Sequence, residues 1–309
     1  AIEAASEPRR VRTFDLPGSR PCCAWDLDVS ADGATAAMAW FDDGASVRDV
    51  ATGDELFFVP APEDVMTPFD LSPDDRYLAV GMGRDKAAGI FEPVLGSEAG
   101  TYRAVRILDR SGHEVGIPLR EDGGFLIDAF RFAPDSRFIA IASHREPPSG
   151  TRIVAADQRV RIWDRERGVV VTEIDGSRFE LGRSGTLAFD PSGRLIALAA
   201  DRQVRIWDVK SGAIVATLPS QPADILALVF SPDGASVATA AIDRTVRLFD
   251  VGSETQRLVL RAPEDCNVES LAVDFCQIVR SVAFSPDGKL LASVDGTTVR
   301  VWALDIDDV

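Results

Sequence analysis

The chain has 309 residues, of which 46% are hydrophobic and 27% are charged, and its formal net charge is −16. A chain of this length buries roughly 75% of its unfolded surface, so its core requires neither a metal nor disulfides. The negative charge argues against nucleic acid as a partner, because phosphate binding needs clustered lysine and arginine. No apolar run reaches the ~18 residues of a membrane span, and the amino end lacks the apolar centre of a signal peptide. Both absences favour a cytoplasmic protein without a membrane partner.

One pattern recurs along the chain: a short turn phrase followed, after an apolar stretch, by a Val-Arg pair. A repeat of this period predicts units that stack on their neighbours to bury their faces. The six turn phrases lie at Val29–Gly33, Leu71–Asp74, Phe132–Asp135, Phe189–Gly193, Phe230–Gly234 and Phe284–Gly288. The corresponding pairs are Val47-Arg48, Val105-Arg106, Val160-Arg161, Val204-Arg205, Val246-Arg247 and Val299-Arg300.

Short strands are predicted throughout, beginning with Arg10–Leu16, which is placed to act as an outer strand before the first copy. The best-preserved stretch shows the whole unit, with apolar and β-branched runs separated by Gly, Pro, Asp and Ser. Its predicted strands are Ile214–Leu218, Ile225–Phe230, Ser236–Ala241 and Thr245–Val251. The last copy stops after its third strand, Val299–Trp302, so Arg10–Leu16 is predicted to supply the missing fourth strand and close a ring.

These units resemble the WD-repeat (WD40) family of β-propellers, and the resemblance covers about residues 11–304. The resemblance implies an all-β propeller of six four-stranded blades in a single domain, 1–309, and a bacterial member of the family. A seventh blade is the alternative if sequence outside this chain supplies it. The family's Trp-Asp pair is intact at Trp163-Asp164 and Trp207-Asp208, and altered at Phe249-Asp250, Leu108-Asp109 and Trp302-Ala303.

The sequence departs from the family in its polar residues. The Gly-His pair is missing throughout, and the Ser of the family's hydrogen-bond network is replaced, for example by Ala241 and Trp40. We therefore expect rigidity to rest more on packing than on that network. The repeated arginines are interpreted as structural, each laying its stem across the next blade and stacking on a Trp; the alternative is a charged binding array.

Three insertions, 84–103, 144–156 and 261–277, are all expected at one rim, because they follow second or fourth strands of their units. Insertions in repeat proteins often mark the binding face. Trp25 is a candidate anchor there; its alternative is to plug the gap between the first and last blades. The predicted partner-binding residues are Trp25, Thr67, Arg84, Phe91, Tyr102, Asp128, His144, Arg145, Arg202, Leu226, Arg244 and Arg280.

The predicted function is a protein–protein interaction module, acting as a monomeric domain that binds a protein or peptide at this rim. The acidic residues of the insertion before the last blade (Glu264, Asp265, Glu269 and Asp274) favour a basic partner, whose binding would weaken with salt. A chain that starts with Ala rather than Met suggests a second hypothesis, a sensor or regulatory domain excised from a larger bacterial protein.

No catalytic motif is found, so the chain is not expected to be an enzyme or to carry a cofactor or metal. The third hypothesis is a metal-dependent propeller hydrolase, in which Asp128 or Asp201 would supply oxygen ligands. None of the four cysteines has zinc-site spacing. Free thiols are expected, with a Cys266–Cys276 bridge as the alternative.

Overall fold

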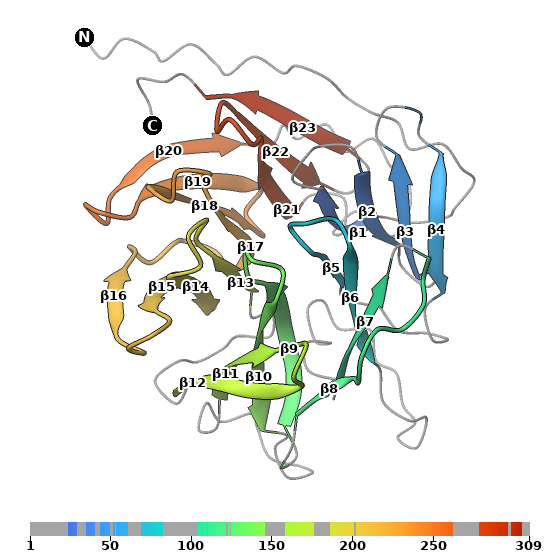
Figure 1. Ribbon diagram of the computed structural model, residues 1–309. Helices are drawn as coiled ribbons and strands as arrows, with labels where there is room; N and C mark the ends of the chain where they lie inside the picture. Colours follow the sequence, from blue (N-terminus) through green and yellow to red (C-terminus); the bar gives the residue numbers. More distant parts are fainter. Residues whose placement is uncertain are drawn as a thin grey trace, which may run out of the picture.

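The computed structural model describes residues 24–29, 35–40, 44–49, 52, 54–60, 69–82, 104–109, 111–121, 123, 125–145, 158–175, 186–200, 202–261, 278–295 and 298–304. All regular structure in these residues is β-strand, arranged as six antiparallel sheets around a ring (Figure 1). Because neither helices nor long apolar spans occur there, the described residues offer no helix able to cross a membrane.

Each sheet is one blade, and its strands follow one another in chain order from the centre outwards. Blade one holds β1 (Ala24–Val29), β2 (Thr35–Trp40), β3 (Gly44–Asp49) and β4 (Glu55–Pro60). Blade two holds β5 (Phe69–Leu71), β6 (Tyr77–Met82), β7 (Ala104–Asp109) and β8 (Leu119–Arg120). Blade three holds β9 (Phe125–Phe132), β10 (Phe138–Arg145), β11 (Gln158–Asp164) and β12 (Val169–Asp175).

The second half repeats this plan. Blade four holds β13 (Thr186–Phe189), β14 (Leu195–Ala200), β15 (Gln203–Asp208) and β16 (Ile214–Thr217). Blade five holds β17 (Ile225–Phe230), β18 (Ser236–Ala241), β19 (Thr245–Asp250) and β20 (Gln256–Arg261). Three described strands form blade six: β21 (Val279–Phe284), β22 (Leu290–Asp295) and β23 (Thr298–Ala303). The strands predicted for blade five agree with these bounds to within one residue.

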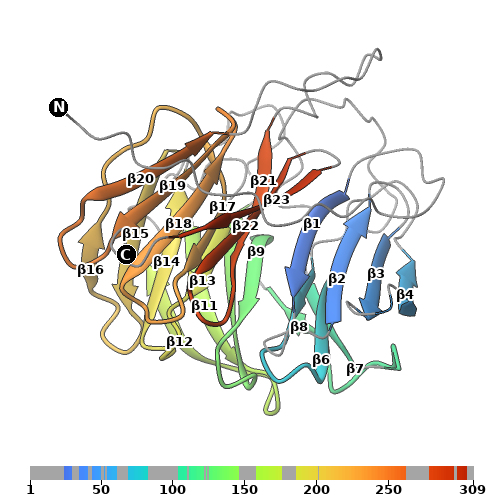
Figure 2. The ribbon, with the colours of Figure 1, turned by 90° about the horizontal axis from the view of Figure 1, so that it is seen from above.

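The inner strands complete the ring. β1, β5, β9, β13, β17 and β21 each contact the next, and β21 contacts β1. Figure 2 shows the same blades from above, with β1 beside β21. This is the architecture of a β-propeller, as the sequence predicted. The predicted closing strand, Arg10–Leu16, lies outside the described residues and stays a prediction, as do the states of the four cysteines.

Large side chains of the third strands fill the spaces between blades. Trp207 belongs to a buried cluster with Ala140 and Ile162 of blade three. Phe249, 1% exposed, belongs to one with Ala197 and Ile206 of blade four. Each such side chain therefore packs against the preceding blade, and the altered Trp-Asp pairs change the volume available at those interfaces.

The turn between the first and second strands of a blade is built by its Ser-Pro-Asp-Gly phrase. In blade five the Ser231 hydroxyl donates to the Asp233 carboxylate over 2.5 Å and accepts from the Ser236 amide over 2.9 Å. Gly234 has φ +73°, and an added Cβ there would lie 3.5 Å from Pro191 Cδ of the neighbouring turn. The turns of adjacent blades thus contact one another, which fixes their spacing around the ring.

The sheet register corrects one alignment made from the sequence. Thr35 pairs with Asp49 as Ser236 pairs with Asp250, so Arg48 is equivalent to Phe249. The residue that stands in the place of the repeated arginine is therefore Ser46. Its hydroxyl accepts from Arg48 Nε over 3.1 Å and donates to Glu55 over 3.1 Å, so a polar cluster has replaced the aromatic side chain in blade one.

Polar side chains make two kinds of contact within the blades. Repeated arginines donate to acids of their own blades, as Arg161 does to Glu173 over 2.8 Å. Blade five also keeps a buried polar network, in which the repeated Arg247 takes part. Thr239 and Arg247 both donate to Gln221 Oε1, over 3.1 and 3.4 Å, and Arg247 donates to Asp243 over 2.6 Å.

Candidate functional site

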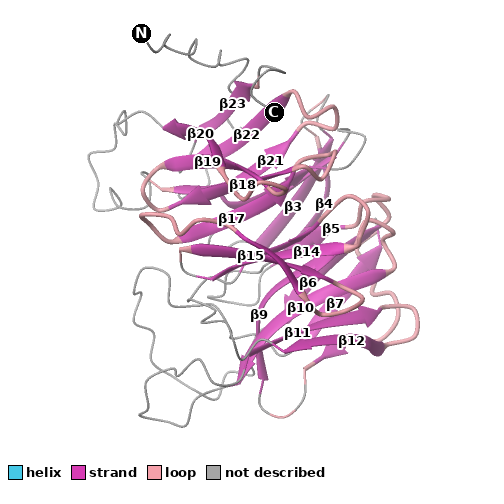
Figure 3. Cartoon of the chain, turned by 90° about the vertical axis from the view of Figure 1, so that its left-hand side faces the viewer, coloured by secondary structure: helices cyan, strands magenta, loops and turns pink. Residues whose placement is uncertain are grey.

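The two rims of the propeller differ in what connects the strands. The segments between β6 and β7, β10 and β11, and β20 and β21 attach at one rim, here called the insertion rim. The opposite, or turn, rim carries the Ser-Pro-Asp-Gly turns and the turns between third and fourth strands. Figure 3 shows several of these described turns on the right-hand side of the view. His144 and Arg145 are the last residues of β10, so this insertion begins after Arg145 rather than at His144.

Inner strands carry a β-bulge at one shared position near the insertion rim. The register of β9 with β10 skips one residue between Ile127 and Ala129, and three other inner strands skip the equivalent residue. A bulge leaves its residue unpaired and redirects its side chain, and bulges are frequent beside functional sites. The skipped residues are Trp25, Asp128, Leu226 and Arg280, all of which the sequence had aligned as candidates.

In blade three the bulge directs Asp128 toward His144 on the neighbouring strand. His144 Nδ1 lies 2.8 and 3.0 Å from the two carboxylate oxygens, and the Asp128 side chain is only 3% exposed. Burial raises the pKa of Asp128, and the hydrogen bond with Asp128 raises the pKa of His144. The pair therefore holds its proton tightly and braces β9 against β10 from within, rather than facing solvent.

Beside this pair, two guanidinium groups lie close to the ring of Phe125. Arg159 Cζ is 3.6 Å and Arg145 Cζ is 5.1 Å from the centre of its ring. Arg159 also donates to Glu121 over 3.0 Å from Nε, and the Glu121 side chain is fully buried. The stack orients Arg145, which is exposed at the end of β10, toward the insertion rim.

Four candidates in blades four to six take different positions at the same rim. Arg202 is exposed, and its carbonyl accepts from the Gln221 amide over 2.7 Å. Arg244 occupies a turn with φ +64°. Leu226 is half-buried, whereas Arg280 is 8% exposed and therefore largely enclosed. Thr67, Arg84, Phe91 and Tyr102 lie outside the described residues, and for Trp25 only the backbone of β1 is described.

The described residues give little sign of a metal or catalytic centre. Within the described ranges, no group of three His, Cys, Asp or Glu side chains is placed to hold an ion. His113 is 82% exposed and lies 3.8 Å from Asp109. It is on the turn rim, whereas the buried His144–Asp128 pair is near the insertion rim.

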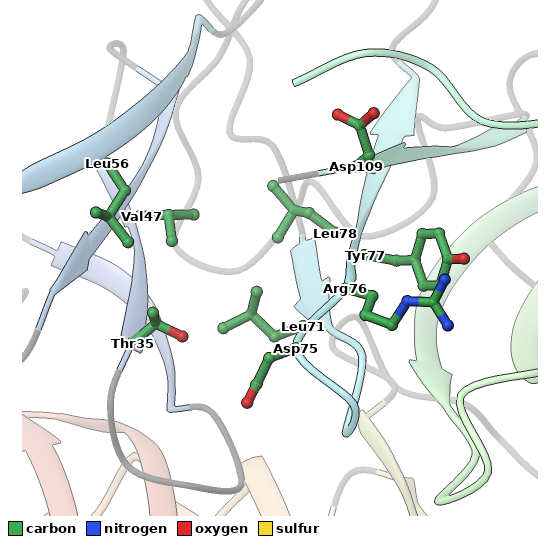
Figure 4. A pocket seen from close by; sticks show the side chains of 9 residues that line it. All are labelled: Thr35, Val47, Leu56, Leu71, Asp75, Arg76, Tyr77, Leu78 and Asp109. Carbon is green, nitrogen blue, oxygen red and sulfur yellow. The ribbon is translucent and has the colours of Figure 1, made fainter. Parts of the chain in front are cut away.

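Sequence reasoning missed a small hollow between blades one and two on the turn rim (Figure 4). Its volume is about 40 Å³, against the about 10–15 Å³ that a single water needs. The sequence offered one hint, because Leu108 stands where blades three to six carry Trp or Phe. The lining residues are Thr35, Val47, Leu56, Leu71, Asp75, Arg76, Tyr77, Leu78 and Asp109.

A ring of antiparallel sheets with one repeated bulge defines the chain as a β-propeller. Its residues 185–208, 212–250 and 269–303 match the model of the WD40 family, described as "WD domain, G-beta repeat". These three segments are WD40 repeats, in agreement with the resemblance seen in the sequence.

Solved structures agree with this fold. A chain of the "Crystal Structure of Mitotic Checkpoint Complex" matches with a TM-score of 0.62 and 16% sequence identity, over 93% of this chain and 76% of that one. No curated protein sequence matches this chain. Proteins with WD40 repeats are generally interaction modules rather than enzymes, and the similar structure is itself a complex of proteins.

Proposed function

We propose that this chain is a protein–protein interaction module that binds a protein or peptide partner on its insertion rim. The observation that carries the proposal is the bulge shared by β1, β9, β17 and β21 close to that rim. The bulged residues differ chemically from blade to blade, as Asp128, Leu226 and Arg280 illustrate. The backbone bulge is the same in these blades, but the side chain at the bulge differs. Such variation favours a role in recognising a partner over a role in assembling the ring.

The rim also combines rigid support with exposed groups. This favours tight binding, because the exposed side chains lose less conformational entropy when the partner binds. Asp128 and His144 brace the end of blade three, and the Phe125 stack holds Arg145 at the surface. In this proposal the buried pair positions the rim, and Arg145 and Leu226 touch the partner.

We further propose that the partner presents a basic segment to the acidic residues of 261–277. The net charge of −16 supports this polarity, because electrostatic complementarity speeds encounter. An affinity that stays constant between 0.05 and 0.5 M salt, roughly a threefold change in Debye length, would remove the basic segment from the proposal.

The test compares the two rims directly. A photo-crosslinking amino acid is placed at Leu226 on the insertion rim or at Asp233, an exposed residue of a turn on the turn rim. Extract of the native host is irradiated, and cross-linked proteins are identified by mass spectrometry. We expect a discrete adduct from position 226 and none of the same mass from position 233. The same adduct from both positions, or from position 233 alone, overturns the assignment to the insertion rim.

Two variants refine this test. Arg145→Ala leaves the buried network in place and is expected to weaken partner binding about tenfold, the loss of one charged contact. Arg167→Ala is the matched control, because Arg167 is 71% exposed on a turn of the same blade at the opposite rim. Equal affinities of the Arg145→Ala and Arg167→Ala variants would exclude Arg145 from the site.

A further inference from the structure

A repeated aspartate at the end of the third strand accepts an arginine in three blades. Asp164 Oδ2 accepts from Arg137 Nη2 over 2.6 Å, and Asp208 Oδ2 accepts from Arg194 Nε over 3.0 Å. In blade five, Arg257 donates to the equivalent carboxylate of Asp250. The other oxygen of each carboxylate accepts backbone amides of the following turn, so each group serves both as a turn cap and as an arginine acceptor.

Blade two keeps the cap but not the arginine. Asp109 Oδ1 accepts from the amides of Ser111 and His113 over 2.8 and 3.0 Å. Within the described part of the chain, no arginine forms an ion pair with this carboxylate, although its side chain is 39% exposed. Arg76 precedes its strand as Arg137 and Arg194 do, but it lies over the Tyr77 ring, 5.4 Å from the centre.

The charge on Asp109 is retained at neutral pH. The backbone amides of His113 and Ser111 hold the pKa of this carboxyl below its ordinary value. Oδ2 is thus an anionic acceptor, and the equivalent aspartates of blades three, four and five each bind a guanidinium.

The hollow of Figure 4 lies beside this carboxylate and borders the buried cluster in which Leu108 packs with Val47 and Leu78. Val47 and Leu78 form its apolar wall, and Leu56, 53% exposed, lies at its edge. In Figure 4 Asp109 and Asp75 lie on opposite sides of the aliphatic group, while Arg76 is directed toward Tyr77. An apolar wall with carboxylates on either side suits a side chain that has an aliphatic stem and a cationic end.

We propose that this hollow is a second docking site, on the turn rim, for an arginine side chain of a partner protein or peptide. The stem packs against Leu56 and Leu78, and the guanidinium donates to Asp109 Oδ2 as Arg137 and Arg194 do to their own acceptors. Arginine is preferred over lysine because its planar fork matches a carboxylate and is more weakly hydrated.

The experiment titrates the full chain with Nα-acetyl-arginine N-methylamide and follows backbone amide resonances by NMR. Saturable shifts are expected at Leu78 and Asp109, with about tenfold weaker binding of the leucine analogue, which lacks the charged contact. The lysine analogue is expected to bind between the two. Shifts that do not saturate, or that are equal for arginine and leucine, overturn the proposal.

Three variants locate the binding. Asp109→Asn keeps an oxygen for the turn amides but removes the charge, and it is expected to weaken arginine binding about tenfold. Asp208→Asn is the matched control, because that carboxylate already accepts Arg194, and it is expected to leave binding unchanged. Arg76→Ala is expected to preserve or strengthen binding, since it removes a competing guanidinium. Loss of binding in Arg76→Ala, or equal loss in both Asn variants, overturns the assignment to Asp109.

This site is independent of the insertion rim. Its failure leaves the cross-link from position 226 unaffected, and failure of that cross-link leaves the arginine titration unaffected.

Discussion

The interface between blades four and five and the interface between blades one and two are built from the same repeat but packed differently. In the first, Phe249 is 1% exposed within a buried cluster that includes Val204 and Leu218. In the second, the equivalent Leu108 is buried in a cluster with Val47 and Leu78, both of which line the hollow, and Leu56 is 53% exposed. The same repeat position thus holds an aromatic side chain at one interface and a smaller aliphatic side chain at the other, where a hollow is present nearby.

The two interfaces also differ in their polar groups. In blade five, Arg247 donates to both Asp243 and Gln221 Oε1, and Thr239 donates to the same Gln221 oxygen. Asp109 in blade two keeps an oxygen for which the described residues supply no arginine. The repeated acidic groups of blade five thus accept arginines of their own blade, whereas the described residues supply no arginine to Asp109.

The largest effect is expected from truncating the packed interface. Phe249→Ala should lower the free energy of unfolding by about 3–5 kcal/mol, because a fully buried ring is removed from a cluster that cannot collapse. Leu108→Ala should cost about 2–3 kcal/mol, since a buried leucine side chain is smaller than a phenylalanine ring and leaves a smaller cavity. Urea denaturation followed by tryptophan fluorescence measures both. A larger loss for Leu108→Ala than for Phe249→Ala would contradict the comparison.

The next effect concerns the polar network of blade five. Gln221→Ala should lower the free energy of unfolding by about 1–3 kcal/mol, because buried Thr239 and Arg247 lose the oxygen that they share. Gln221→Glu keeps this oxygen and adds a charge opposite Arg247, so it should lose much less. Blade three provides the precedent, because Glu121 stands there as the buried acceptor of arginines. Equal losses in the two variants would show that the network does not depend on this acceptor.

A larger side chain near the hollow should raise the free energy of unfolding, in contrast to the truncations above. Leu108→Trp restores the family's side chain and should raise the free energy of unfolding by about 0.5–2 kcal/mol, the usual gain from cavity filling. It should also abolish the binding of the arginine probe. Leu248→Trp is the matched control in a filled interface, where overpacking should cost about 1–3 kcal/mol. Destabilisation of similar size in both variants would mean that the hollow is not a packing defect.

Much of the fold could be predicted from the sequence because each repeat contains turn-forming residues at the ends of its strands. The phrase Phe230–Gly234 combines Ser and Asp side chains that bond local backbone with a Gly at positive φ, so the flanking strands are fixed by local chemistry. The same logic failed at Val47-Arg48. There the pair occurs two positions later in the strand, and only the cross-strand register reveals that Ser46 is the equivalent residue.

The candidate site was predictable in position but not in contacts. Counting back from each turn phrase locates Asp128, Leu226 and Arg280 at one rim, because the repeat has a constant length there. The pairing of Asp128 with His144 depends on a bulge, and sequence spacing does not report a bulge. The altered pair Leu108-Asp109 can also be recognised in the sequence. The hollow near it cannot, because its walls come from two neighbouring blades.

The smallest effect is a difference between Asp208 and Asp109 in how much each stabilises the fold as the pH is lowered. The backbone amide of Ser211 and the guanidinium of Arg194 lower the pKa of Asp208 from 3.8 to about 2. A depressed pKa means that the ionised group stabilises the fold above pH 3.8, and that this stabilisation is lost as the pH falls from 3.8 toward 2. Asp208→Asn should therefore be less stable than the parent at pH 7, with the difference shrinking across this range.

The pKa of Asp109 is also lowered, but by turn amides without an arginine. Asp109→Asn should accordingly show a smaller stability difference from the parent at pH 7, and a smaller change in that difference on acidification. Urea denaturation at pH 7, 4 and 3 measures both differences. An equal response of the two variants would mean that the carboxylate of blade two already has a cationic partner in the folded chain, and the contrast between the interfaces would then be one of packing alone.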